Sequence, residues 1–162
     1  MPADMARRPA PATRSPRGAL HLLCRASDVV IAIRADQVRE TMRPLPLAAL
    51  PDVPPFVLGI AVIRGAPTPV VDAQRLLGKQ GSPTRFVTLH AGERSVAMAF
   101  DAVVGTRELP GATLTTLPPL VNAAVSSFVE AVGVLDEDLL LVLQAARVVP
   151  ERVWEGLEGV VG

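Results

Sequence analysis

The chain has 162 residues, with 16 basic and 16 acidic side chains and no formal net charge, so it carries no electrostatic signature of nucleic-acid binding. A chain of this length buries roughly 70% of its unfolded surface, so neither a disulfide nor a metal ion is needed to hold a core. Cys24 is the only cysteine, which excludes an internal disulfide. We expect Cys24 to be a small, buried, apolar residue on a strand, and a single unpaired cysteine is typical of proteins in the reducing cytoplasm.

Residues 1–18 have the composition of a disordered tail. They contain four prolines and four arginines against a single aspartate, and no large apolar residue follows Met5. We therefore expect one domain over residues 19–158 after this tail. No run of about 18 apolar residues occurs, so we expect no membrane-spanning helix.

The first part of the domain reads as short strands. Apolar runs at Ala19–Arg25 and Val29–Ile33 are separated by Ser27-Asp28, a turn pair, which predicts a hairpin. Val38–Met42 then alternates apolar and polar residues, as a half-buried strand does. A proline-rich segment, Arg43–Pro55, predicts an ordered loop before the next strand.

The stretch from Phe56 to Gly78 organises the rest of the chain. Its apolar run Val57–Ile63 is followed by the turn pair Arg64-Gly65 and a second extended segment, which predicts a hairpin. Prolines in that segment place it at a strand start or a sheet edge, because proline cannot donate a ladder hydrogen bond. Asp72 is predicted to cap a short helix that ends at Gly78.

The remaining residues predict more hairpins and one helix. Arg85–His90 pairs with Arg94–Phe100, and Ser127–Leu135 with Leu139–Leu143, while 101–109 continues as a strand bent at Gly105. A closing helix after Pro150 should dock through residues at helical spacing: Val153, Trp154, Leu157 and Val161. Many short strands separated by turn signals indicate an all-β barrel or sandwich.

The sequence offers little for catalysis. His21 and His90 each stand alone on a strand, without neighbours at metal-ligand spacing, and Ser126-Ser127 lacks a nucleophile elbow. Asp72 lacks the Asp-Thr/Ser-Gly turn of an aspartic hydrolase and fits a helix cap better. Asp101 reads as a strand-end charge that pairs or caps. We therefore expect no enzyme, no metal and no cofactor, and we interpret the chain as a binding module.

The hairpin motif resembles a known family. The pattern LG-x4-RG-x3-PVVD followed by LLG, between Leu58 and Gly78, is very similar to the core motif of CheW-like domains. Weaker similarities are Val38-Arg39-Glu40-Thr41, Phe100-Asp101-Ala102-Val103, and Val132-Gly133-Val134 with the strand after it. The sequence departs from the family pattern at Thr41, Ala61-Val62, Ala73, Ala97 and Gln144, which concerns surface detail more than fold.

This resemblance implies a fold and a role. The fold is two five-stranded SH3-like β-barrel subdomains that share an apolar seam, with short helices and a C-terminal helix. The role is a cytoplasmic adaptor, at receptor arrays on the inner face of the membrane, that couples the cytoplasmic tips of chemoreceptors to the regulatory domain of a histidine kinase. The interface residues carried over by resemblance are Val38, Glu40, Ile63, Arg64, Gly65, Asp101 and Val103.

Two other functions remain as alternatives to the chemosensory adaptor. The chain could be a divergent CheW-like regulatory domain that binds another partner in a two-component pathway, and an enzyme is a distant third. Arg64, seen in isolation, could be a solvated turn residue. Its setting between two apolar runs favours pairing or docking, because a guanidinium stays charged and binds carboxylates bidentately. Glu40, on a neighbouring strand in the resembled fold, could orient it or offer a second charge to the partner.

Deletion of residues 1–18 tests the assignment of the tail. Because these residues have almost no apolar surface to bury, we expect the truncated chain to keep the melting temperature of the full chain. Differential scanning calorimetry on both proteins measures this. A melting temperature lower by many degrees would show that the tail packs on the domain.

Overall fold

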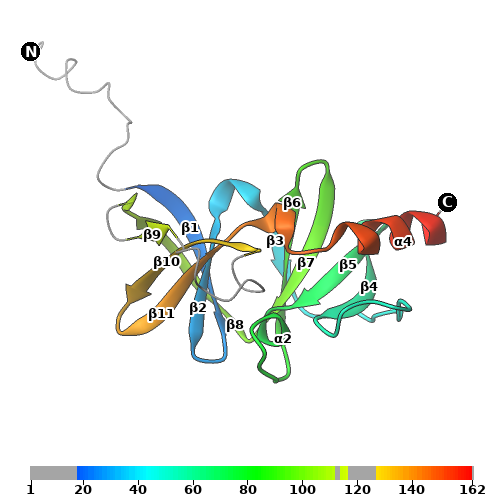
Figure 1. Ribbon diagram of the computed structural model, residues 1–162, viewed down its shortest axis with the longest axis horizontal. Helices are drawn as coiled ribbons and strands as arrows, with labels where there is room; N and C mark the ends of the chain where they lie inside the picture. The colour runs from blue at the N-terminus through cyan, green and yellow to red at the C-terminus, as the bar shows by residue number, and fades with distance from the viewer. Residues whose placement is uncertain (1–17, 112–113, 117–126, 162) are drawn as a thin grey trace, which may run out of the picture.

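The computed structural model describes residues 18–111, 114–116 and 127–161 (Figure 1). The tail expected over residues 1–18 therefore lies outside the described residues, apart from Gly18. Within these ranges, no helix is both long enough and apolar enough to cross a bilayer.

Among the described residues, eleven strands form two sheets, as predicted for an all-β chain. The six-stranded sheet has the order β8-β1-β2-β11-β10-β9, and the five-stranded sheet has the order β3-β6-β7-β5-β4. The strands of the first sheet are β1 (Ala19–Ala26), β2 (Val29–Arg34), β8 (Ala102–Leu109), β9 (Thr115–Thr116), β10 (Val129–Leu135) and β11 (Asp138–Leu143). Those of the second are β3 (Val38–Met42), β4 (Val57–Ile63), β5 (Ala66–Asp72), β6 (Arg85–Ala91) and β7 (Arg94–Phe100).

The six-stranded and five-stranded sheets form two subdomains that lie side by side (Figure 1). Residues 19–34 and the strands from β8 onward form one sheet, and residues 38–100 form the other. The six-stranded sheet has one strand more than the expected five, because the two-residue β9 pairs with β10. Both sheets are open, which differs from the closed barrels that the resemblance implied: among the described strands, no ladder joins β8 to β9 or β3 to β4.

Strand β2 shows how the core is divided. Val29, Ile31 and Ile33 lie in a large cluster shared by both sheets, which we call the shared seam. Val30 and Ala32 point to the other face and belong to a second cluster, confined to the six-stranded sheet and its neighbours. Both faces of this strand are therefore buried, which explains why its sequence is a continuous apolar run rather than an alternating one.

Strand β7 repeats this division in the five-stranded sheet. Val96, Met98 and Phe100 enter the shared seam, whereas Ala97 and Ala99 enter a third cluster inside the five-stranded subdomain. All five side chains are fully buried. Two subdomain interiors and one seam between them match the resembled fold.

Strand β5 shows which of the two expected settings its prolines occupy. Pro67 and Pro69 pair with Val62 and Ile60 of β4, and the parallel ladder with β7 begins only at Val70. The prolines therefore stand at a strand start, as predicted, but β5 lies between two strands and not at a sheet edge. Since proline cannot donate a hydrogen bond, pairing on the β7 side starts after Pro69.

The helices follow the predicted pattern. Asp72 caps α2 (Ala73–Leu76) by accepting a hydrogen bond from the backbone N–H of Gln74 at 2.9 Å, and Gly78 follows with a φ of 78°. Single 3-10 turns occupy Ala35–Gln37 and Ala145–Arg147.

The closing helix α4 (Glu151–Val161) packs on β5 and buries its apolar face. Val153, Trp154 and Leu157 are buried in the shared seam, as predicted, while the side chain of Val161 lies outside the described residues. Arg94 of β7 contacts this helix through the face of the Trp154 ring, at 4.8 Å from its centroid.

The need for glycine at position 59 can be tested by comparison with Gly105, which has a similar backbone conformation. The φ of Gly59 is 144°, and a Cβ there would lie 2.4 Å from the carbonyl oxygen of Ala48. That oxygen accepts a hydrogen bond from the N–H of Ile60 at 2.8 Å, and the N–H of Ala48 donates to the Ile60 carbonyl at 2.8 Å. Gly105 has a φ of 148° but nothing within 4 Å of such a Cβ. We expect Gly59→Ala to destabilise the fold more than Gly105→Ala, by about 1–3 kcal/mol, because only the first also displaces a hydrogen-bonded backbone. Chemical denaturation of both variants measures this, and equal losses would contradict it.

Candidate docking site

The turn between β4 and β5 consists of Arg64 and Gly65, between the paired residues Ile63 and Ala66. Both turn residues have positive φ, 52° for Arg64 and 78° for Gly65. Two left-handed residues in a two-residue hairpin loop form the turn that matches the twist of the strands. Glycine adopts this backbone freely, whereas an L-residue such as arginine pays a conformational cost. The arginine at this turn is therefore not explained by the turn itself.

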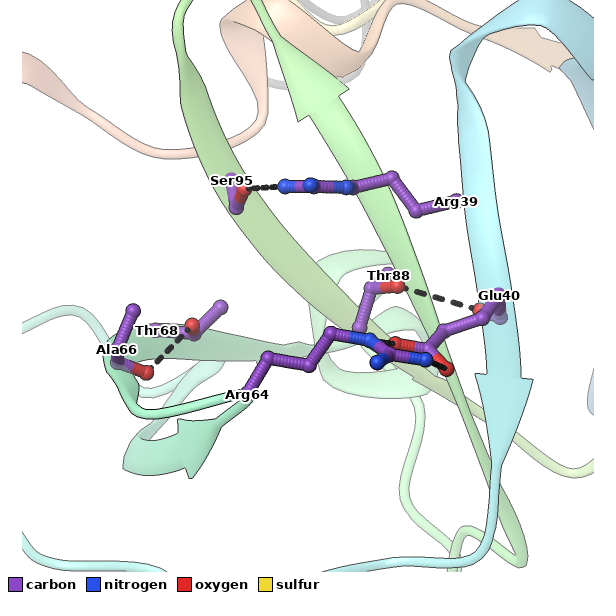
Figure 2. Close-up of polar contacts among 7 residues, drawn as sticks. All are labelled: Arg39, Glu40, Arg64, Ala66, Thr68, Thr88 and Ser95. Atoms are coloured by element: carbon purple, nitrogen blue, oxygen red, sulfur yellow. Dashed lines mark hydrogen bonds and ion pairs between the residues drawn. The ribbon is translucent and has the colours of Figure 1, made fainter.

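The guanidinium of Arg64 forms a bidentate ion pair with the carboxylate of Glu40 (Figure 2). Arg64 Nε donates to Glu40 Oε2 at 2.6 Å, and Arg64 Nη2 donates to Oε1 at 2.8 Å. The side chain of Arg64 remains 74% exposed and that of Glu40 29% exposed. The expectation that Glu40 orients Arg64 is supported by this geometry, and the pair presents most of the guanidinium to solvent.

The pair spans the open side of the five-stranded sheet. Glu40 lies on β3, at one end of the strand order, while Arg64 follows β4, at the other end. No ladder joins β3 to β4 in the described structure, so the two side chains bridge strands that share no backbone hydrogen bonds. Figure 2 shows the Arg64 side chain reaching from the turn toward the strand that carries Glu40.

A small cleft of about 170 Å³ lies at this bridge. It is lined by Arg39, Glu40, Ile63, Arg64, Ala66, Thr68, Thr88 and Ser95. The structure thus brings together three of the predicted site residues, Glu40, Ile63 and Arg64, with Gly65 in the adjoining turn. Val38 lies two residues before Glu40 and packs partly against the shared seam.

The polar lining of the cleft was not predicted from the sequence. Arg39 Nη1 donates to Ser95 Oγ at 2.8 Å, and Thr88 Oγ1 donates to the backbone oxygen of Glu40 at 3.3 Å. Among these residues, the sequence indicated a surface position only for Arg39, through the alternation of polar and apolar residues in Val38–Met42. Ser95 and Thr88 are added by the pairing register of β3, β6 and β7, which the sequence pattern does not specify.

The two other predicted site residues lie elsewhere. Asp101 stands between β7 and β8, and Val103 pairs with Cys24 on β1 and packs partly against the shared seam. Neither lines the cleft at Arg64. The predicted set therefore divides into two separate places in the fold.

The chemistry of the cleft suits recognition by charge. The side chains that line it are two arginines, one carboxylate, three hydroxyls and two apolar groups, and the one carboxylate is engaged with Arg64. In the part of the chain that the structure describes, no three His, Cys, Asp or Glu side chains gather to hold a metal ion. Burial raises the pKa of the Cys24 thiol to about 12, which keeps it protonated and unreactive.

A family model described as the CheW-like domain matches residues 20–153. The chain belongs to the CheW-like domain family. This CheW-like chain is 32% identical over 99 residues to protein FrzA of Myxococcus xanthus, an alignment that covers 59% of this chain and 61% of FrzA. It is 28% identical over 135 residues to chemotaxis protein CheW of Rhizobium meliloti (strain 1021), which covers 81% of this chain and 87% of that protein.

The CheW-like fold is also seen in a solved structure. The crystal structure of the scaffolding protein TtCheW from Thermoanaerobacter tengcongensis superposes with a TM-score of 0.68 at 18% identity, over 78% of this chain and 88% of that one. The fold and family inferred from the hairpin motif are therefore confirmed. The family match ends at residue 153, so most of α4 follows it.

The ion pair predicts a pH dependence. The hydrogen bond from Arg64 holds the pKa of the Glu40 carboxyl below its ordinary value. A lowered folded-state pKa means that the stabilisation from this pair is present above the unfolded pKa of a glutamate, about 4.3, and is lost as the pH falls through the folded pKa. We expect carbon-13 NMR to show Glu40 titrating at a lower pH in the wild type than in Arg64→Ala.

The control for this titration is Arg34→Ala. Arg34 pairs with Asp36 at 3.4 Å and has no part in the cleft, so its removal should leave the Glu40 titration unchanged. A Glu40 midpoint that is the same in the wild type and Arg64→Ala would show that the pair does not persist in solution.

Proposed function

We propose that this CheW-like chain is a non-enzymatic adaptor of a bacterial chemosensory system. It couples chemoreceptors to a histidine kinase through protein–protein contacts, in the cytoplasm at receptor arrays. The kinase regulatory domain and the cytoplasmic tips of the receptors are its partners. The family match over residues 20–153, and relatives named chemotaxis protein CheW and FrzA, support this role.

One observation carries the proposal to particular residues: an arginine occupies a turn position that favours glycine. Arg64 has a φ of 52°, a conformation that costs an L-residue about 1–2 kcal/mol relative to the right-handed one. Residues held in such a conformation are concentrated at functional sites, where the surrounding structure maintains them. Here the carboxylate of Glu40 fixes the guanidinium while leaving it largely exposed.

A fixed guanidinium suits docking. An arginine already held by the fold loses less side-chain entropy when it meets a partner than a mobile one does. An exposed arginine that already holds one carboxylate can share or exchange it for a carboxylate of the partner, and burial of that contact strengthens it. We infer that the turn with Glu40, Arg64 and its neighbours Ile63 and Gly65 docks the partner. Val38, Asp101 and Val103 complete the proposed contact set.

Replacement of Arg64 by alanine separates docking from folding. An exposed ion pair contributes little to stability, so we expect the melting temperature of Arg64→Ala to change by less than about 3 °C. Affinity for the kinase regulatory domain should fall roughly 5- to 150-fold, as for the loss of a desolvated interface anchor. Thermal melting and calorimetric titration on the same variant measure the two effects, with Arg34→Ala as the matched arginine control.

Two results would count against the docking role. If Arg64→Ala unfolds the protein, the ion pair stabilises the fold and has no docking role. If affinity and melting temperature both stay at wild type, Arg64 is only a turn residue. Failure of the unmodified chain to bind either the kinase domain or receptor tips would remove the adaptor role itself and favour a different two-component partner.

A charge-swapped double variant, Glu40→Arg with Arg64→Glu, distinguishes an ion pair that acts only within the fold from a contact of Arg64 with the partner. The swap preserves an ion pair across the open side of the sheet but places the cation on β3. If Arg64 binds a carboxylate of the partner, affinity stays low in the double variant. Recovery to the wild-type affinity would show that only the internal pair matters.

A further inference from the structure

The chain returns from the five-stranded sheet to the six-stranded sheet through a single residue. Strand β7 of the five-stranded sheet ends at Phe100, strand β8 of the six-stranded sheet begins at Ala102, and Asp101 stands between them. The backbone N–H of Asp101 donates to the carbonyl oxygen of Arg25 on β1 at 2.9 Å. This crossing is therefore tied to the six-stranded sheet at the point where the five-stranded sheet ends.

The carboxylate of Asp101 joins the same two sheets. Its Oδ2 accepts a hydrogen bond from the backbone N–H of Ser27 at 2.7 Å, in the turn between β1 and β2. Its Oδ1 accepts one from Gln74 Nε2 on α2, which follows β5. Each oxygen thus holds an element of a different subdomain. Ser27 has a φ of 61°, so this bond also supports a turn residue in a costly backbone conformation.

The segment after α2 is attached to the same residue. The hydroxyl of Thr84 donates to the carbonyl oxygen of Asp101 at 2.5 Å, and the N–H of Thr84 donates to the carbonyl oxygen of Phe100 at 2.9 Å. A Cβ on Gly81 would lie 2.3 Å from Gln74 Oε1, so the chain passes closely over the Gln74 amide. Residues 74–84 are therefore held at both ends by contacts to Asp101.

A second contact crosses at the same place. Lys79 Nζ lies 3.1 Å from the Asp28 carboxylate, so the segment after α2 also reaches the turn between β1 and β2 directly. The buried neighbours of this junction, Ala26, Ala73 and Phe100, all belong to the shared seam. The polar contacts around Asp101 thus lie at the rim of the apolar contact between the two sheets.

We propose that Asp101 is a latch that fixes the two sheets relative to each other. It holds the turn between β1 and β2 against α2 and residues 77–84, and its release lets this end of the molecule open while the shared seam stays packed. The proposal goes beyond the adaptor role, because it assigns to Asp101 a conformational role in addition to its place in the proposed contact set.

Distance measurement between spin labels tests the latch. Cysteines introduced at Val62 on β4 and Val134 on β10, which are 69% and 71% exposed, report on the two sheets. A second pair, Val104 on β8 with Val134, reports within the six-stranded sheet alone. The native Cys24 is fully buried and stays unlabelled.

We expect Asp101→Ala to broaden the distance distribution between labels 62 and 134 at least about twofold and to leave that between labels 104 and 134 unchanged. Asp36→Ala is the matched control, because Asp36 is 69% exposed and pairs only locally with Arg34. It should change neither distribution. An unchanged distribution between labels 62 and 134 in Asp101→Ala, or equal broadening of both pairs, would overturn the latch.

Hydrogen exchange with a second variant separates the contact of Asp101 with Gln74 from its contact with Ser27. Gln74→Met removes one donor and keeps the length of the side chain. The amides of Lys79 and Thr84 should then exchange about tenfold faster in both variants, and that of Ser27 faster only in Asp101→Ala. Should Asp101→Ala fail to fold, Gln74→Met decides: tenfold faster exchange at Lys79 and Thr84 supports the latch, and wild-type rates overturn it.

Discussion

The fold depends on one apolar contact, the shared seam between the two sheets. Strands β2 and β7 each send alternate side chains into this seam and the others into the interior of their own subdomain. A strand that is buried on both faces has no place for polar side chains along its length. The side chains that β2 and β7 send into these clusters are therefore all apolar. Arg64 lies in a turn, Glu40 on an edge strand and Asp101 between two strands.

Charged side chains bridge the open side of the five-stranded sheet. Its two terminal strands share no ladder within the described residues, and Arg64 and Glu40 connect them through side chains instead. Water competes for an ion pair that is so exposed, so the pair adds little to the free energy of folding. What it does provide is a fixed direction for the guanidinium. That property matters for recognition and is nearly irrelevant to folding.

The sequence predicted local features well and long-range ones poorly. The Arg64-Gly65 turn, the Asp72 cap and the buried face of α4 each depend on residues within a few positions of one another. For the prolines of β5 the sequence left a strand start and a sheet edge both open. The strand start holds, and the parallel ladder from Val70, which places β5 inside its sheet, could not be foreseen. The subdomain arrangement came from the family motif and not from the strand pattern, since continuous apolar runs do not show which face meets which partner.

Arg64 and Asp101 have opposite physical settings, and this sets what each can do. Arg64 meets a charged partner in water, where both side chains can exchange to another molecule at little cost. Asp101 is half-buried, and its two oxygens accept from a backbone N–H and a buried amide that belong to different subdomains. The buried Gln74 amide loses its acceptor if the carboxylate leaves, which carries a desolvation cost. The first arrangement favours contact with a partner, and the second favours holding the molecule in one shape.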